Sequence, residues 1–463
     1  MTLIKSISGI RGTIGGSPEN NLTPVDAVKF AAAYGSYMQS QSKDTQLTIV
    51  IGRDARISGE MIQSLVMQTL IGMGIDIIDL GLSTTPTVEM AVVDKKAQGG
   101  IILTASHNPK QWNALKLLDA QGEFLDAAAG AKIVSLVEKE DFNFAEVDDL
   151  GQIKQDKTAI DQHIQAVIAH PLIDLPAIKA AGFSAVVDGV NSTGGIAVPA
   201  LLDALGVNCF PLYCEPTGHF PHNPEPLKEH LGDLAKEVVQ QKANLGIVVD
   251  PDVDRLAFMD ESGKMFGEEY TLVACADYVL SKTPGNTVSN LSSTRALRDV
   301  TEYAGGKYFA SAVGEVNVVA KMKENKAVIG GEGNGGIIDP NLHYGRDALV
   351  GIVLFLSLLA QRKCSVSALK ASYPKYYMSK GKIALDESLD VDALLLKMED
   401  EYRKYQPLTI DGVKIDFPEG WIHMRKSNTE PIVRVYAEAD SQDKADELTQ
   451  RFSSELLAIS KHL

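Results

Sequence analysis

One arrangement of elements occurs three times in this chain, and it restricts the fold more than any other feature. Residues 48–81 contain an apolar β-branched run, a polar turn, an amphipathic segment with helical spacing, a glycine and a second apolar run. The same order returns at 184–214 and, less clearly, at 287–315. Strand-length apolar runs on either side of a helical period predict a strand–helix–strand unit. We therefore expect three related α/β units, each with a polar turn at the strand edge where ligands usually bind.

The last part of the chain follows a different pattern. From about Tyr373, short alternating strands are combined with amphipathic segments at 391–405 and 445–461, which predicts a small antiparallel α+β domain. A chain of 463 residues is too long for one core, and the three units are too far apart for a solenoid. We predict three similar mixed α/β domains, 1–152, 153–259 and 260–373, followed by a smaller α+β domain, 374–463.

Charge and cysteine usage limit the partners. A net charge of −16 argues against binding to nucleic acid or to an anionic membrane, so an anionic substrate must meet locally concentrated Arg and Lys. The four cysteines form no CxxC pair, and the N-terminal residues lack a signal-peptide pattern. The apolar run Ala348 to Ala360 is too short to span a bilayer and predicts a buried helix. We expect a cytoplasmic protein with reduced thiols, a monomer or homodimer, whose partner is a small molecule.

The first chemical stretch is TASHNP, residues 104–109. An apolar run leads into it and Pro109 ends strand pairing, which predicts an exposed loop for Ser106. A hydroxyl beside the imidazole of His107, ahead of Lys116, is well placed to be activated or phosphorylated. Taken alone, the same residues are also typical of an ordinary polar turn.

The second stretch, residues 243–263, ends a buried strand with Asp250, Asp252 and Asp254 at alternate positions. Hard oxygen ligands at this density suit Mg²⁺. A calcium EF-hand is excluded, because its sixth position would be Arg255 instead of glycine. A second reading makes Asp250 the phosphate-accepting nucleophile of a phosphatase similar to the haloacid dehalogenases. A solvated acidic turn is a weak explanation, since three carboxylates this close repel each other without a cation.

Two further stretches offer groups for a sugar phosphate. Residues 328–340 contain five glycines, which allow close backbone approach and present Glu332 and Asn334 to sugar hydroxyls. This loop does not match the phosphate-binding P-loop pattern. Residues 423–439 combine a guanidinium fork, hydroxyls and an amide, a donor set suited to a phosphate monoester. The donors are Arg425, Ser427, Asn428 and Thr429, with Arg434 nearby.

Together and in this order, the four stretches resemble the α-D-phosphohexomutase family, whose members include phosphoglucomutases, phosphomannomutases and phosphoglucosamine mutases. The resemblance covers essentially the whole chain, and TASHNP with DPDVDR and RKSNTEP is a highly specific combination. It implies three α/β domains and a smaller C-terminal domain around a central cleft. It also implies that Ser106 carries the catalytic phosphoryl group and that Ser106, Asp250, Asp252 and Asp254 hold Mg²⁺.

The resemblance assigns further roles. Arg11, Lys116, His107 and Arg255 would serve the reaction centre, with Lys116 a candidate general acid or base. Glu332 and Asn334 would recognise the sugar, and the donors of the fourth stretch would hold the phosphate that does not react.

The implied reaction consists of two phosphoryl transfers. Phosphorylated Ser106 would give its group to a hexose monophosphate, and the resulting hexose 1,6-bisphosphate would turn around and return its other phosphate. We hypothesise that the C-terminal domain rotates to close the cleft.

The sugar loop reads GEGNGG, where many family members have serine in place of Asn334, and this variant favours glucosamine phosphate over glucose and mannose phosphates. A magnesium-dependent phosphatase that uses Asp250 and a non-catalytic sugar-phosphate-binding protein are the alternatives.

Overall fold

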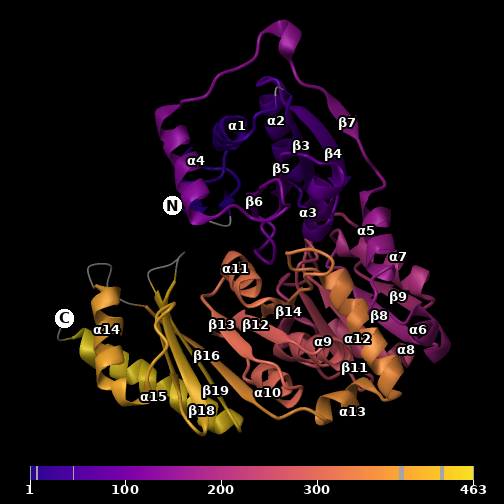
Figure 1. The fold of residues 1–463 in the computed structure, drawn as a ribbon, viewed down its shortest axis with the longest axis vertical. Helices are drawn as coiled ribbons and strands as arrows, with labels where there is room; N and C mark the ends of the chain where they lie inside the picture. The colour runs from indigo at the N-terminus through magenta and orange to yellow at the C-terminus, as the bar shows by residue number, and fades with distance from the viewer. Residues whose placement is uncertain (1, 7–8, 45, 385–389, 428–431, 462–463) are drawn as a thin grey trace.

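A computed structural model describes residues 2–6, 9–44, 46–384, 390–427 and 432–461. Each of four sheets belongs to its own section of the chain, and we call these sections domains I to IV in chain order. Domain I lies at the top of Figure 1, domain II at the lower right, domain III in the lower centre and domain IV at the lower left. Domain III therefore lies between its two neighbours.

Domain I contains a mixed seven-stranded sheet in the order β1-β2-β6-β5-β3-β4-β7. Its strands are β1 (Ile4–Ser6), β2 (Gly9–Thr13), β3 (Thr48–Arg53), β4 (Asp76–Leu82), β5 (Gly99–Leu103), β6 (Trp112–Leu118) and β7 (Ile153–Gln155). Its helices are α1 (Pro24–Gln41), α2 (Gly59–Ile71), α3 (Thr85–Asp94) and α4 (Ala127–Lys139), with a 3₁₀ turn at Val147–Asp149.

Domains II and III each contain a four-stranded sheet. Domain II comprises β8 (Ser184–Asp188), β9 (Asn208–Leu212), β10 (Leu245–Val249), β11 (Leu256–Asp260), α5 (Ala159–Ile168), α6 (Leu175–Ala181), α7 (Gly194–Leu205), α8 (Gly232–Gln241) and a 3₁₀ turn at Lys228–His230. Domain III comprises β12 (Asn286–Asn290), β13 (Tyr308–Ser311), β14 (Ala327–Glu332), β15 (Gly336–Ile338), α9 (Glu268–Lys282), α10 (Ala296–Tyr303), α11 (Glu315–Asn325), α12 (Ala348–Arg362) and α13 (Val366–Ala371).

The three α/β domains share one topology. In domain II the first strand, β8, pairs in parallel with β9 on one side and β10 on the other, and β11 returns antiparallel to β10. Strands β12 to β15 repeat this pattern in domain III, and β3, β4, β5 and β6 repeat it in domain I. The three sequence repeats correspond to the first strand, its helix and the second strand of each domain, which confirms the predicted fold class.

Domain IV is the smaller α+β domain expected from the sequence. Its antiparallel sheet has the order β16-β19-β18-β17. The elements are β16 (Tyr377–Ala384), α14 (Val391–Glu401), a 3₁₀ turn at Arg403–Tyr405, β17 (Val413–Asp416), β18 (Gly420–Lys426), β19 (Ile432–Ala439) and α15 (Gln442–Ser460).

Local sequence explains where individual helices begin. Thr23 and Asp26 form a reciprocal capping box at the start of α1, with a proline in the first turn. Asp347 caps α12 through the backbone N–H groups of Leu349 and Val350. Residues Ala348 to Ala360 of α12 are fully buried, as the apolar run predicts.

The hydrophobic cores do not correspond one to one with the domains. One continuous core includes residues of both domain II and domain III, and helix α12 contributes to it. Domain I has two cores of its own, and domain IV has another, formed within that domain. All four cysteines are free thiols. No helix in the described ranges has both the length and the hydrophobicity needed to cross a membrane.

Candidate active site

The predicted chemical stretches occupy equivalent positions in the fold. Ser106 lies in the loop from β5 to β6, the three aspartates between β10 and β11, and the glycine-rich stretch between β14 and β15. Each of these loops joins the third strand of an α/β domain to its antiparallel fourth strand. In domain IV, Arg425 precedes the connection from β18 to β19. The shared topology therefore puts each set of polar groups at the same end of its sheet.

Ser106 is buried, with 3% of its surface exposed, and the exposed loop expected from the sequence is wrong in this respect. Its Oγ donates a hydrogen bond of 2.6 Å to Oδ2 of Asp250, so domain II covers the loop. The backbone of Ser106 is left-handed, at φ 49°, and its N–H donates to Thr104 Oγ at 2.9 Å. A non-glycine residue in this conformation is strained and is held by its surroundings.

Arg56, a residue that sequence reasoning missed, provides much of that restraint. Its guanidinium donates to the backbone carbonyls of Ser106 and Asn108, the second at 2.7 Å. It also donates to the carbonyls of Pro109 at 2.8 Å and Trp112 at 3.0 Å. The side chain is 1% exposed and is neutralised by Asp54 at 3.0 Å. Arg56 belongs to the polar turn after β3. That turn is the sequence feature from which this residue could have been found.

The three aspartates of the second stretch are fully buried, and their carboxylate oxygens lie within 4.8 Å of one another. Lys116 of β6 donates to Oδ2 of Asp252 at 2.7 Å and to Oδ2 of Asp254 at 3.2 Å. Burial acts to lower the pKa of Lys116, but these two carboxylates outweigh it and raise that pKa above its ordinary value. The structure thus brings Ser106, Lys116 and the aspartates together from two domains.

The aspartates fit a divalent cation. Among the described residues, Oδ1 of Asp252 and Oδ1 of Asp254 are buried and have no hydrogen-bond partner. Burial, with the charges of these two neighbours, raises the pKa of Asp250 well above its ordinary range. Buried carboxylates are stable in a protein only when they are paired or coordinate a metal, and three oxygen donors this close match the preference of Mg²⁺.

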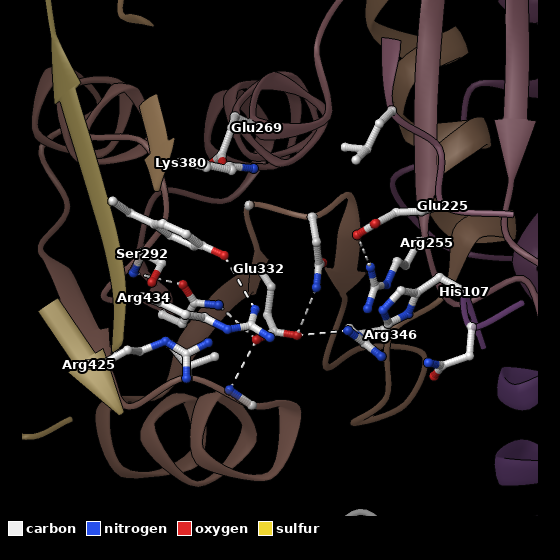
Figure 2. A pocket seen from close by; sticks show the side chains of 18 of the residues that line it. His107, Glu225, Arg255, Glu269, Ser292, Glu332, Arg346, Lys380, Arg425 and Arg434 are labelled. Atoms are coloured by element: carbon white, nitrogen blue, oxygen red, sulfur yellow. Dashed lines mark hydrogen bonds and ion pairs between the residues drawn. The ribbon is translucent and has the colours of Figure 1, made fainter. Parts of the chain in front are cut away.

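A cavity of about 670 Å³ lies at the meeting point of the four domains. Its wall includes predicted residues from every domain: Arg11, His107, Arg255, Glu332, Asn334, Arg425 and Arg434. Figure 2 shows Arg425 and Arg434 at one end, His107 and Arg255 at the other, and Glu332 between them. A cavity of this size holds a small ligand, and its two ends carry positive charge.

The end of the cavity next to Ser106 combines neutral and cationic groups. His107 Nδ1 lies 3.3 Å from Ser106 Oγ. Burial, with the nearby Arg255 and Arg11, lowers the pKa of His107 well below its ordinary value, so this imidazole is neutral. Arg11 donates to the side-chain oxygen of Asn108 at 2.7 Å, and burial and Arg255 lower its pKa to about 10. Arg255 forms a 3.4 Å ion pair with Glu225.

Glu332 at the centre of the cavity is held by Arg346, a second residue that sequence reasoning missed. Arg346 Nη1 lies 2.7 Å from Glu332 Oε2, and Nη2 lies 2.6 Å from Asp254 Oδ2. Asn290 donates to Glu332 Oε1 at 2.7 Å. Burial acts to raise the pKa of Glu332, but Arg346 and this hydrogen bond outweigh it and lower the pKa, so the carboxylate is ionised. Arg346 therefore joins the glycine-rich stretch of domain III to the aspartate stretch of domain II.

The opposite end of the cavity belongs mainly to domain IV. Arg425 is 9% exposed, and Ser427 is buried and does not line the cavity. Asn428 and Thr429 lie outside the described residues. Lys380 of β16 and Glu269 of α9 add a further ion pair at 3.6 Å, which no motif in the sequence marked.

Comparison with known proteins agrees with this geometry. Four family models match the chain: phosphoglucomutase/phosphomannomutase alpha/beta/alpha domain I over residues 3–144, domain II over 161–263, domain III over 267–377, and the C-terminal domain over 382–455. The fold and the cavity define an intramolecular phosphotransferase, a class of isomerase. The chain belongs to the α-D-phosphohexomutase family, and it is a phosphohexomutase. The boundaries that we predicted between the domains stay predictions.

Individual relatives cover nearly the full chain. A phosphoglucomutase/phosphomannomutase of Thermococcus kodakarensis is 35% identical over 94% of this chain and 96% of its own. A probable phosphoglucosamine mutase of Methanopyrus kandleri is 31% identical and covers 96% of each chain.

A solved structure of a phosphoglucomutase/phosphomannomutase family protein from Burkholderia thailandensis is 26% identical, covers 100% of this chain and 98% of its own, and has a TM-score of 0.86. An N-acetylphosphoglucosamine mutase of Aspergillus fumigatus, solved with GlcNAc-6P and magnesium, covers 93% of this chain and 96% of its own. At 13% identity and a TM-score of 0.56, it shows a shared fold.

Proposed function

We propose that this phosphohexomutase works through a phosphorylated Ser106 and a hexose 1,6-bisphosphate intermediate. The observation that carries the proposal is the 2.6 Å hydrogen bond from Ser106 Oγ to Asp250. It lies next to His107, which lines a cavity with cations at both ends, although Ser106 and Asp250 do not line that cavity themselves. A serine in a strained and tightly held loop, beside a carboxylate cluster, suits transfer chemistry better than a structural turn does.

In the first half-reaction, the phosphorus–oxygen bond to Ser106 breaks as a free hydroxyl of the sugar monophosphate attacks. The hydroxyl proton leaves to a base, and His107, whose imidazole is neutral, is our candidate for it. The Ser106 oxygen needs a proton as it departs, and protonated Lys116 is the candidate acid. The second half-reaction reverses these transfers with the other phosphate of the bisphosphate, so atoms and charge balance over the cycle.

We assign Mg²⁺ to Asp250, Asp252 and Asp254, with Ser106 or its phosphate completing the site. Bound there, the ion would neutralise negative charge that develops on the transferred phosphoryl group. The chain's own cations add to this: Arg11 and Arg255 line the same end of the cavity. Their role is to hold the phosphoryl group in line between the donor and acceptor oxygens.

The phosphate that does not react is assigned to domain IV. Arg425 and Arg434 line the cavity there, and a guanidinium fork suits a phosphate monoester. The bisphosphate must present each of its ends to Ser106 in turn, and a fixed phosphate site opposite the serine accommodates both orientations. Ser427, Asn428 and Thr429 stay predicted partners of this phosphate.

We propose glucosamine phosphate as the preferred sugar. Glu332 is an ionised carboxylate in the cavity wall, flanked there by Asn334, and it suits the ammonium group of a 2-amino sugar. Relatives named phosphoglucosamine mutase support this choice, whereas the Thermococcus kodakarensis relative acts by its name on glucose and mannose phosphates. Comparing kcat/KM for glucosamine, glucose and mannose phosphates tests it, and an equal or higher value for either neutral sugar overturns it.

Ser106→Ala tests the phosphoserine. We expect turnover to fall by at least about 10⁴-fold and the labelled phosphoenzyme to disappear, since no other hydroxyl takes over a lost nucleophile. Asn108→Ala, which alters the same loop and keeps the hydroxyl, should retain the label. Turnover and label that persist in Ser106→Ala would refute the assignment.

The phosphatase alternative has its own signature. An aspartyl phosphate at Asp250 is cleaved by mild alkaline hydroxylamine, whereas a phosphoserine survives it. We expect the label to survive in the native enzyme. Nothing in the structure favours the phosphatase over the mutase, and membership of the phosphohexomutase family argues against it.

A further inference from the structure

A second group of metal-ligating side chains lies outside the cavity, where three domains meet. It consists of His163 on α5 of domain II, and His343 and Asp347 just before α12 of domain III. Glu89 on α3 of domain I faces His343. None of these four residues lines the cavity described above. The mechanism proposed for the mutase does not use them.

The two imidazoles converge on one oxygen atom. His163 Nε2 lies 2.8 Å from Asp347 Oδ2, and His343 Nε2 lies 3.3 Å from the same atom. The two rings are nearly perpendicular, at 88°, with centroids 6.3 Å apart. Ligand atoms around a tetrahedral Zn²⁺ with bonds of about 2.0 to 2.1 Å are separated by roughly 3.3 Å. The two observed nitrogen–oxygen distances are close to this value, and all three ligand atoms lie within 4.8 Å of one another.

Each of the three side chains is held in its orientation by a second contact on its far side, as metal ligands usually are. His163 Nδ1 lies 2.9 Å from the hydroxyl of Thr87, and His343 Nδ1 lies 3.3 Å from Glu89 Oε2. The other oxygen of Asp347 accepts from the backbone N–H of Leu349 at 2.8 Å. Both Nε2 atoms are therefore the ones directed at the shared oxygen.

Two carboxylates are buried at this junction. Glu89 and Asp347 are 2% and 0% exposed, and Glu89 Oε2 lies 3.3 Å from Nδ1 of His343. Gly345 allows this approach, because a Cβ there would lie 1.9 Å from Glu89 Oε2. A buried carboxylate is stable in a protein only when it is paired or coordinates a metal, so these two carboxylates suit a site for a divalent cation.

We propose that His163, His343 and Asp347 bind a first-row divalent transition-metal ion, Zn²⁺ in the first instance, at the junction of domains I, II and III. Imidazole nitrogen suits Zn²⁺ better than Mg²⁺, whereas the all-oxygen aspartates suit Mg²⁺. The site is structural, since it ties together α3, α5 and the start of α12. It depends on neither the sugar nor the phosphoserine proposed above.

Zinc titration of the full-length protein tests the proposal. The protein is stripped with a chelator, saturated with Mg²⁺ to fill the aspartate cluster, and titrated with Zn²⁺ against a chromophoric competitor. We expect one equivalent to bind and the Tm to rise. Co²⁺ in place of Zn²⁺ should give the visible absorption of a low-symmetry site with imidazole ligands.

Variants locate the bound ion. The double variant His163→Gln/His343→Gln should bind Zn²⁺ at least about 100-fold more weakly, and Glu89→Gln about 10- to 100-fold more weakly. The matched control is His170→Gln, which changes another buried histidine beside a carboxylate, Asp339 at 3.3 Å, and should bind as the native protein does.

Two outcomes would overturn the site. The first is equal Zn²⁺ affinity in the native protein and in the double variant, and the second is an equal loss in His170→Gln. Should the double variant fail to fold, nitrogen NMR of the native protein labelled at its nine histidines decides the question. Zn²⁺ should shift the Nε2 signals of two histidines, and unchanged signals would refute the proposal.

Discussion

The joint between domains II and III differs in kind from the joint between domains III and IV. Domains II and III share one hydrophobic core, in which Phe355 of α12 stacks on Phe258 of β11 at 3.8 Å. Domain IV has a separate core and meets domain III mainly through polar contacts. Arg295, for example, contacts Asp416 at 3.0 Å, and Lys414 Nζ donates to the carbonyl of Leu291 at 2.7 Å.

Because of this difference, the cavity wall formed by domains II and III should be rigid, whereas the wall formed by domain IV is free to move. Separating domains II and III would expose apolar surface at a cost of about 25 cal/mol per Å², whereas polar contacts exchange with water at little net cost. The aspartate stretch of domain II and the glycine-rich stretch of domain III therefore lie on one rigid body. Arg425 and Arg434, which line the cavity from domain IV, lie on a part that can move without opening a core, and this supports the closure hypothesis.

The largest expected effect distinguishes the core shared by domains II and III from the core of domain IV. Phe355→Ala removes a side chain shared by domains II and III and should cost about 3–5 kcal/mol, lowering the midpoint of the main unfolding transition seen by circular dichroism. Phe452→Ala lies in the core of domain IV and should leave that midpoint unchanged.

The chain carries its own reporter for domain IV. Trp112 and Trp421 are its two tryptophans, so in a Trp112→Phe background Trp421 of β18 reports on domain IV alone. Phe452→Ala should shift the fluorescence transition of Trp421 by a comparable free energy. If it lowers the main transition as much as Phe355→Ala does, domain IV is not an independent unit.

The next prediction concerns the loop of Ser106 in domain I. Arg56→Met removes the donor that holds the loop of Ser106 and leaves Asp54 buried without its partner. Breaking a buried pair in this way costs about 3–5 kcal/mol, and displacing a reacting group by about 1 Å can cost about 100-fold in rate. We expect kcat to fall by about 100-fold at temperatures where the variant is folded.

Arg53→Met is the matched control for Arg56. Arg53 is the last residue of β3, directly before that turn. It donates to Gln63 at 2.9 Å and to the carbonyl of Asp54 at 3.2 Å, and among the described residues its side chain makes no hydrogen bond or ion pair with the loop of Ser106. Its kcat should stay close to native. An equal loss in both variants would mean that the turn as a whole, and not the guanidinium of Arg56, restrains the serine.

In domain IV, Arg425→Ala should lower kcat/KM by about 10- to 150-fold, because a hydrogen bond to a charged group contributes about 1.5–3 kcal/mol. Lys426→Ala is the control, since Lys426 is the exposed neighbour on β18. Small-angle scattering should show that sugar phosphate contracts the native protein and not Arg425→Ala. A native protein that does not contract would break the closure hypothesis.

The smallest effect is a pH dependence at the polar joint. Burial lowers the pKa of Lys414 to about 8, below its ordinary value near 10.5, although Asp416 acts to raise it. Between pH 8 and 10.5 the unfolded chain therefore binds more protons at this site than the folded chain, and stability rises with pH. Relative to Lys414→Met, the stability of domain IV reported by Trp421 should rise by up to about 1.4 kcal/mol per pH unit. A difference that falls or stays flat over this range would contradict the depressed pKa.

Much of the fold could be predicted because strand and helix periods are local properties of the sequence. The repeats at 48–81 and 184–214 became strand–helix–strand units, and the cavity collects residues from each predicted chemical stretch. The burial of Ser106 could not be predicted, because it depends on Asp250, which lies 144 residues away. Tertiary contacts of that kind leave no local pattern.

The two arginines that the sequence did not predict, Arg56 and Arg346, also depend on tertiary contacts for their roles. Arg56 stands in a polar turn that was recognised, but its four carbonyl partners became visible only with the loop in place. Arg346 stands in no motif, and only the structure shows it contacting Asp254 and Glu332. A buried arginine is paired by necessity, and its partners identify its role.

The polar joint of domain IV also bears on how such enzymes diversify. Two parts that meet through ion pairs and backbone hydrogen bonds need no matched apolar surfaces, so one can be exchanged by recombination while the other keeps its packing. A lineage could replace domain IV, to which we assign the phosphate that does not react, and retain the chemistry inherited with the rest of the chain.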